Sequence, residues 1–226
     1  MKTNIIQKFS FLFACFGALF LLTSSGKYYS DFKRAKKEVD TLVLLTPYVR
    51  VEFSKDQEFS KDDELSEILS QQIFNDAHSL LDKKYTLAGL ILPFDSIDAS
   101  ELSNLFSNLD NSNKNTELST PFFIQKHIKE CANRYLLMVV FNGYYNANYE
   151  PYYRMNQMAV NNGVGVRIVI YPNTKFFNSD MRVLIFDNQK NIIVYYDKKY
   201  SKDVDPRIIN SVEKMTLDIL RPLYYK

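Results

Sequence analysis

Apolar positions along the chain follow two different periods, and each period predicts one kind of element. In four stretches they recur every three to four residues, which is the spacing of one helix face. These predicted helices cover residues 60–84, 98–109, 120–135 and 205–223. Runs that are continuously apolar, or that alternate with polar residues, are typical of strands. They occur at residues 41–53, 85–93, 135–145, 164–171, 181–186 and 192–196.

Every predicted helix begins with a capping signal, either a capping box or a cap residue followed by proline. The pairs are Ser60 with Asp63, Asp98 with Glu101, Thr120 with Pro121, and Asp205 with Pro206. Pro47 predicts a bend or bulge inside the first strand, and residues 187–191 predict a hairpin turn between the last two strands. The segment Glu52–Asp56 is repeated as Glu58–Asp62, and we expect a polar loop there.

The resulting order is β-α-β-α-α-β-β-β-β-α, which predicts an α/β fold. We expect a mixed sheet with early βαβ units and a late antiparallel hairpin, with helices packed on the sheet. About 200 residues remain after a leader, which suits one domain with a substantial core. We therefore assign residues 41–226 to a single α/β domain and residues 27–40 to a charged tether.

Residues 1–26 have the layout of a secretory signal peptide. Lys2 and Lys8 form a positive start, residues 9–22 are almost entirely apolar, and residues 23–26 are small. The apolar run is shorter than the roughly 20 residues that span a bilayer. We expect export with cleavage before Lys27, and an exported, periplasmic or envelope-associated mature protein.

Two other interpretations of the leader remain open. Cys15 is a possible lipidation site because Leu12 and Ala14 fit such a site, although Phe13 is bulky and an apolar run follows. Lysine and arginine are frequent at residues 27–37, and positive charge directly after an apolar run opposes translocation. An uncleaved anchor through residues 9–25 is therefore the second alternative.

The charge balance argues against nucleic acid as a partner. The chain has 28 Lys and Arg against 26 Asp and Glu, a formal net charge of +2. Lys2 and Lys8 account for the whole excess, because no acidic residue precedes Asp31. Without the leader the net charge is zero, so no general basic field remains. Cys131 is then the single cysteine, and we expect it to be a small buried residue on a helix.

The sequence contains no recognisable motif for catalysis, metal binding or nucleotide binding. His78 has no ligand partner four residues away, and the pair His127 and Cys131 lacks the two further ligands of a zinc site. Gly163 and Gly165 precede a predicted strand, whereas a dinucleotide loop follows one. We expect no metal, no cofactor and no enzymatic activity. A hydrolase-type enzyme with an unrecognised site, for example near Asp95, is the alternative.

A tyrosine- and amide-rich segment follows the third main strand run. Tyrosine offers a large rigid surface with a polar tip, which suits recognition of proteins or sugars. The candidate partner-binding residues are Tyr144, Tyr145, Tyr149, Tyr152, Tyr153 and Arg154. The alternative is a long strand connection that is packed by its own side chains.

The order of elements resembles the envelope α/β domain of curli-secretion and penicillin-binding-protein-activator lipoproteins, which is related to the TolB N-terminal domain. The similar features are Pro47 inside the first strand, the turn from Phe186 to Asn191, and the closing helix from Asp205. The chain departs from that pattern at Lys190 and Asn191, where the family has a glycine, and in having no tryptophan. The resemblance implies an accessory, non-catalytic role at the envelope and transfers no functional residue.

These observations predict an exported cell-envelope protein with a non-catalytic partner-binding or assembly-accessory domain. The expected partner is an envelope protein or a glycan. Membrane contact is expected only through the N-terminus, if the leader is uncleaved or lipidated. A membrane-anchored structural component is a further alternative to the hydrolase-type enzyme.

Overall fold

The computed structural model describes residues 27–28, 39–56, 58–90, 99–113, 116–129, 131–149, 176–202 and 204–224. The predicted signal peptide with Cys15, most of the predicted tether and the predicted strand at 164–171 lie outside the described residues. No helix in the described ranges is long and apolar enough to cross a membrane.

The described residues form a mixed α/β fold around one sheet of nine strands, which confirms the predicted fold class. The strands are β1 (Lys27–Tyr28), β2 (Thr41–Leu45), β3 (Tyr48–Lys55), β4 (Glu58–Lys61), β5 (Thr86–Leu90), β6 (Leu118–Ser119), β7 (Tyr135–Asn146), β8 (Phe177–Asp187) and β9 (Ile192–Ser201). The early strands β2 and β5 pair in parallel, as do β2 and β7. The late strands β8 and β9 form the predicted antiparallel hairpin.

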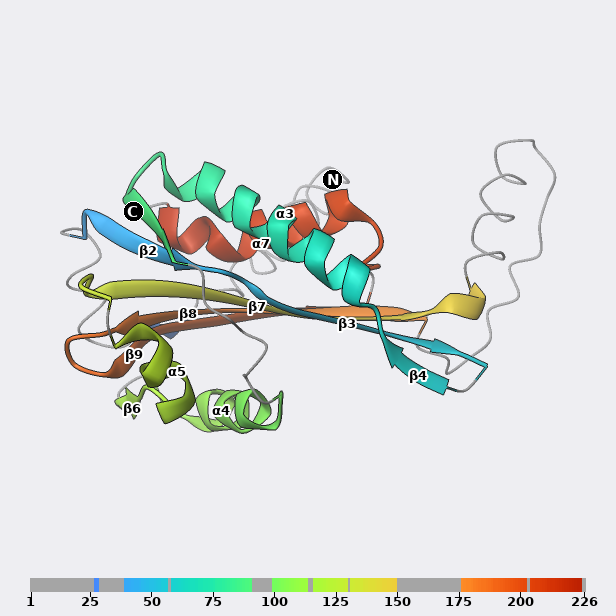
Figure 1. Ribbon diagram of the computed structural model, residues 1–226, viewed down its shortest axis with the longest axis horizontal. Helices are drawn as coiled ribbons and strands as arrows, with labels where there is room; N and C mark the ends of the chain where they lie inside the picture. The colour runs from blue at the N-terminus through green and yellow to red at the C-terminus, as the bar shows by residue number, and fades with distance from the viewer. Residues whose placement is uncertain are drawn as a thin grey trace, which may run out of the picture.

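Helices cover both faces of the sheet. Helices α3 (Asp63–Leu81) and α7 (Ile209–Tyr224) lie on one face, and α4 (Ala99–Asn111) and α5 (Phe122–Ile128) lie on the other (Figure 1). Each pair of helices buries its apolar stripe in a separate core. The α3 side includes Leu69 and Ile73, and the α4 side includes Leu105 and Leu109. The predicted helical periods therefore identified both cores.

The first predicted strand is divided at Pro47, as its sequence suggested. Val43 and Leu44 pair with residues 136 and 137 of β7, and Tyr48 pairs with Val140. The chain thus advances one residue more than β7 between these pairs, which is a bulge. Beyond the bulge, β3 replaces β2 as the strand that pairs with β7.

The repeated segment at residues 52–62 is a hairpin, so the prediction of a polar loop was wrong. Its two copies pair antiparallel as β3 and β4, with Phe53 opposite Ser60. All four residues of β4 are exposed. Because neither face of this strand is buried, its sequence shows no apolar alternation.

Three of the predicted caps were displaced by neighbouring structure, and Asp98 of the fourth lies outside the described residues. Ser60 belongs to β4, and Asp62 caps α3 by accepting the N–H of Leu65 at 3.0 Å. Asp205 accepts the N–H of Arg207 in a turn, and α7 begins only at Ile209. At α5, the N-cap position is occupied by Pro121 and makes no side-chain capping bond.

The prediction that Cys131 lies on a helix was also wrong. Helix α5 ends at Ile128, because the backbone turns there and the amide of Asn188 binds the carbonyls of Ile128 and Cys131 at 3.2 and 2.8 Å. Cys131 follows this turn as a half-buried residue beside the α4 core.

Candidate functional site

A polar strip crosses the sheet on the face that carries α4. Leu136, Met138 and Val140 of β7 are buried in the core of that face. Because side chains alternate along a strand, the next residue on this face is Asn142. The pairing register places Arg50 of β3 on one side of Asn142 and Asp180 of β8 on the other. The apolar face therefore changes to a polar one beyond Val140.

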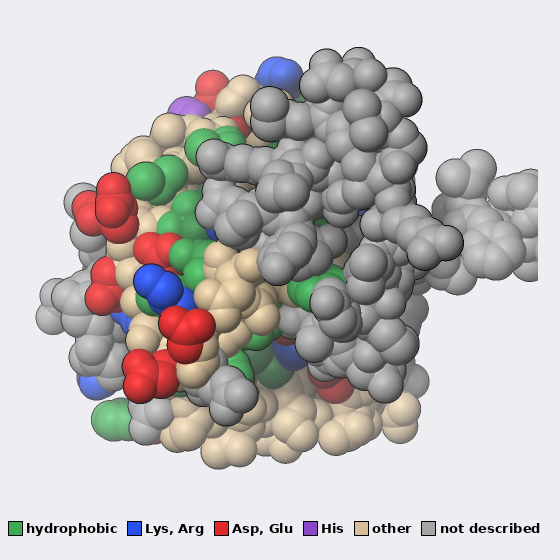
Figure 2. Space-filling view, turned by 90° about the vertical axis from the view of Figure 1, so that its right-hand side faces the viewer, with side chains coloured by type: hydrophobic (Ala, Val, Ile, Leu, Met, Phe, Trp, Pro, Cys, Tyr) green, Lys and Arg blue, Asp and Glu red, His purple; other side chains and the backbone are tan. Residues whose placement is uncertain are grey.

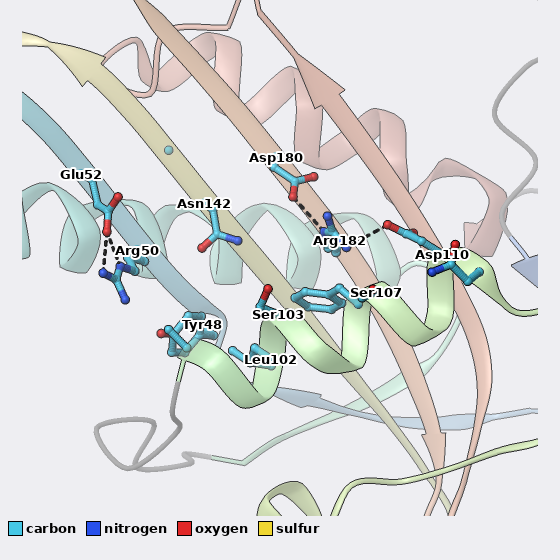
Figure 3. Close-up of a pocket in the computed structure, with 14 residues that line it drawn as sticks. Tyr48, Arg50, Glu52, Leu102, Ser103, Ser107, Asp110, Asn142, Asp180 and Arg182 are labelled. Carbon is cyan, nitrogen blue, oxygen red and sulfur yellow. Dashed lines mark hydrogen bonds and ion pairs between the residues drawn. The ribbon is translucent and has the colours of Figure 1, made fainter.

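Helix α4 and this strip enclose a cleft of about 640 Å³. Figure 3 shows Ser103 and Ser107 of α4 beneath the strip, with Asn142 between two ion pairs. The lining residues are Tyr48, Arg50, Glu52, Ala99, Leu102, Ser103, Phe106, Ser107, Asp110, Asn111, Asn142, Gly143, Asp180 and Arg182. The volume is within the roughly 300–1,000 Å³ range of small-molecule sites.

Arg182 forms the end of the cleft nearest the C-terminal turn of α4. Its Nε donates to Asp180 Oδ2 at 2.8 Å, its Nη1 donates to the hydroxyl of Tyr196 at 3.0 Å, and its guanidinium lies 4.4 Å from the centre of the Phe106 ring. Nη1 also lies 3.5 Å from Asp110 Oδ2 on α4. Only 16% of the Arg182 side chain is exposed, so this network joins α4 to the sheet in a largely desolvated place.

Asp110 is the partner of this network on the helix. Its Oδ1 accepts a hydrogen bond from the Tyr196 hydroxyl at 2.8 Å and also lies 3.0 Å from Lys198 Nζ. Burial by itself raises the pKa of Asp110, but the bonds to Lys198 and Tyr196 and the charge of Arg182 outweigh it, so the pKa is lowered. Asp110 is therefore held as a carboxylate.

The opposite end of the cleft carries the pair Arg50 and Glu52. Arg50 Nε donates to Glu52 Oε1 at 2.8 Å, and both side chains are about two-fifths exposed. This bond is the largest influence on the pKa of Arg50 and raises it.

At the end of the cleft formed by Arg182, burial by itself lowers the pKa of the guanidinium. The neighbouring Asp180, Tyr196 and Asp110 more than offset burial, so the pKa of Arg182 is raised.

Asn142 stands between these ion pairs. Its side-chain amide makes no hydrogen bond to any residue that the structure describes, although it is half-buried. An amide offers two donors and one acceptor oxygen. The arrangement across the strip is thus a cation–anion pair, a free amide and a second anion–cation pair (Figure 3).

The predicted tyrosines divide between the two faces of the sheet. Tyr144 lies on the cleft face, where its hydroxyl is 2.7 Å from Ser54 Oγ and its ring is 6.2 Å from that of Phe59. Tyr145 lies on the α3 face, where it donates to Asp62 at 2.7 Å. The backbone of Tyr149 is in the 3-10 helix η2 (Ala147–Tyr149). Tyr152, Tyr153 and Arg154 lie outside the described residues.

Asp95, Gly163 and Gly165 lie outside the described residues, and His78 is exposed on α3. Within the described ranges, no group of three His, Cys, Asp or Glu residues is placed to hold a metal ion. At the end of the molecule shown in Figure 2, acidic and basic side chains lie next to one another.

Sequence reasoning missed the cleft. One signal was present, since Asp180 and Arg182 alternate with the apolar Met181 and Val183 where the strand predicted at residues 181–186 begins. That alternation indicates a strand with one polar face. The neighbours of that face on β3 and β7 depend on strand register, which the sequence pattern does not supply.

Comparisons by sequence found no relationship. No protein-family model matches the chain, and no curated protein matches it.

Solved structures share its general architecture at low similarity. The PelC dodecamer from Paraburkholderia phytofirmans is 7% identical, covering 83% of this chain and 89% of that one, with a TM-score of 0.37. A putative neuraminyllactose-binding hemagglutinin homolog from Helicobacter pylori is 10% identical, covering 89% and 86%, also with 0.37. The LpoB C-terminal domain from Salmonella enterica is 12% identical, covering 72% and 83%, with 0.31. The resemblance to activator lipoproteins is therefore a weak similarity of fold, and it supports no conclusion about function.

Proposed function

We propose that the chain is an exported domain of the bacterial cell envelope that binds a partner, without catalysis, through the cleft between α4 and the polar strip. Tyr144 extends the strip by one position, because it pairs with Glu52 on the same face. We propose it as part of the binding surface. Tyr145, Tyr149, Tyr152, Tyr153 and Arg154 stay predictions from the sequence.

The geometry of the cleft is the observation that carries this proposal: two ion pairs, Arg50 with Glu52 and Arg182 with Asp180, flank the half-buried amide of Asn142. The directions of the pKa shifts agree with it. A general acid or base works best when its pKa is moved toward the operating pH. In the cleft the shifts go the other way: the pKa of Asp110 is lowered, and those of Arg50 and Arg182 are raised. Charges fixed in this way suit recognition of a ligand better than proton transfer.

The location in the envelope rests on the N-terminal sequence alone. Residues 1–26 have the n-region, apolar run and small residues of a signal peptide. After removal of these residues the chain has zero net charge, so its overall charge neither attracts nor repels a charged partner at long range. Selectivity for a ligand therefore has to come from the cleft itself.

Co-purification from cells tests the role of the cleft. Asn142→Lys fills the centre of the strip with a long cation, whereas Asn108→Lys makes the same change on an exposed position of α4 that does not line the cleft. After cross-linking in intact cells, we expect the Asn142→Lys protein to lose partner material that the parent and Asn108→Lys proteins retain. Equal recovery from both variants would remove the cleft from the proposal. Circular dichroism establishes that both variants are folded.

A further inference from the structure

We infer that the ligand of the cleft is an uncharged polyhydroxylated molecule, that is, a neutral segment of a saccharide. This inference rests on the proposed binding function and adds its chemical class.

The charges of the cleft disfavour ionic ligands of either sign. Its lining contains three carboxylates and two guanidiniums. The guanidiniums are already engaged, Arg50 with Glu52 and Arg182 with Asp180. An anionic ligand would lie beside Glu52 and Asp180, and a cationic one beside Arg50, and like charges at short range are unfavourable in a partly desolvated site.

The strip offers donors and acceptors in alternation. The exposed pair Arg50 and Glu52 leaves guanidinium N–H groups and carboxylate lone pairs beyond those used within the pair, because guanidinium has five donors and carboxylate has about four acceptor sites. Arg182 also uses Nη1 for Tyr196 and Asp110, so the pair Arg182 and Asp180 offers fewer donors. Asn142 adds both kinds of group between the two pairs. A hydroxyl donates one hydrogen bond and accepts others, so neighbouring hydroxyls of a sugar match such a row.

The walls of the cleft fit the remaining surface of a sugar ring. Tyr48 provides apolar area at one end, above the buried Leu102, and the hydroxyls of Ser103 and Ser107 face the strip from α4 (Figure 3). A site that combines apolar walls with a few convergent polar groups is typical of small-molecule recognition. Sugar rings present C–H faces as well as hydroxyl edges, and both surfaces have a counterpart here.

A glycan array tests the inference with the purified full chain. The array carries neutral, anionic and cationic oligosaccharides, including two matched pairs: N-acetylglucosamine trimer with the cationic glucosamine trimer, and galacturonic acid trimer with its neutral methyl ester. We expect binding to neutral members above binding to their charged counterparts. Asn142→Ala should weaken that binding about 5- to 10-fold, the usual effect of one lost hydrogen bond, and Asn108→Ala should leave it unchanged.

Glu52→Gln is a second cleft variant, chosen because its partner Arg50 is substantially exposed and the fold does not depend on the pair. It removes a carboxylate, so binding of the galacturonic acid trimer should rise relative to its neutral methyl ester. An array without neutral binders, a preference for charged members, or equal binding by the Asn142→Ala protein would overturn the inference. If co-purification still depends on Asn142 while no neutral glycan binds, the partner is a protein and the proposed binding function stands.

Discussion

Replacing Arg182 with methionine tests whether α4 is held on the sheet by the buried ion network. Methionine keeps the length and apolar bulk of the stem, so the change removes mainly the charge and its hydrogen bonds. Asp180 and Asp110 then lose a guanidinium that lies 2.8 and 3.5 Å away, and the Phe106 ring loses the cation above it.

The magnitude follows from the burial of the network. Breaking a buried pair by removing one partner costs about 3–5 kcal/mol, because a carboxylate is left desolvated. Asp180 and Asp110 are 20% and 26% exposed, so water offsets part of that cost, and about 2–3 kcal/mol remains. For a chain of this size we expect the melting temperature to fall by roughly 4–12 °C.

Arg50→Met is the matched control. Arg50 also pairs with an acidic residue two positions away on its strand, but its side chain is 39% exposed and that of Glu52 is 41% exposed. Such a pair contributes less than about 1 kcal/mol. Urea unfolding should therefore place the midpoint of the Arg182→Met protein well below that of Arg50→Met, with hydrogen exchange in α4 accelerated only in the former. Equal midpoints for the two variants would refute this description of the network.

Three further predictions concern the opposite face and the leader. Gly143→Ala places a methyl 2.8 Å from Pro206 Cβ, so we expect a loss of about 1–3 kcal/mol in urea unfolding. Burial raises the pKa of Asp197 to about 6, so the folded state binds extra protons from about pH 4 to 6. The free energy of unfolding of the protein should therefore fall as the pH rises from about 4 to 6, and Asp197→Asn should abolish this pH dependence. Intact mass and N-terminal sequencing should give a mature start near Lys27; diacylglycerol on Cys15 or an intact Met1 would contradict cleavage.

The elements that could be predicted from the sequence are those whose burial sets a period. Helix α3 buries Leu69 and Ile73, and β7 is buried along most of its length, so both patterns identify their elements directly. Strand β4 is fully exposed and pairs with β3 at the rim of the sheet. Its residues gain no burial from the fold, so their pattern carried no signal of a strand.

The cleft could not be predicted because it depends on contacts distant in sequence. Arg50, Asn142 and Asp180 form one row only because β3 and β8 both pair with β7 in a particular register. The bulge at Pro47 fixes part of that register, since it moves Tyr48 opposite Val140. The proline itself was visible in the sequence, but the strand that β3 joins beyond it was not.

Photo-cross-linking from α4 tests the central claim most directly. Ser103 lines the cleft, whereas its neighbour Asn104 is exposed and does not line it. A benzophenone amino acid introduced at either position reacts with C–H bonds nearby, in glycans and proteins alike. We predict that irradiation of living cells gives an adduct from position 103 and none from position 104. Equal adducts from both positions, or none from position 103, would contradict a ligand-binding cleft between α4 and the sheet.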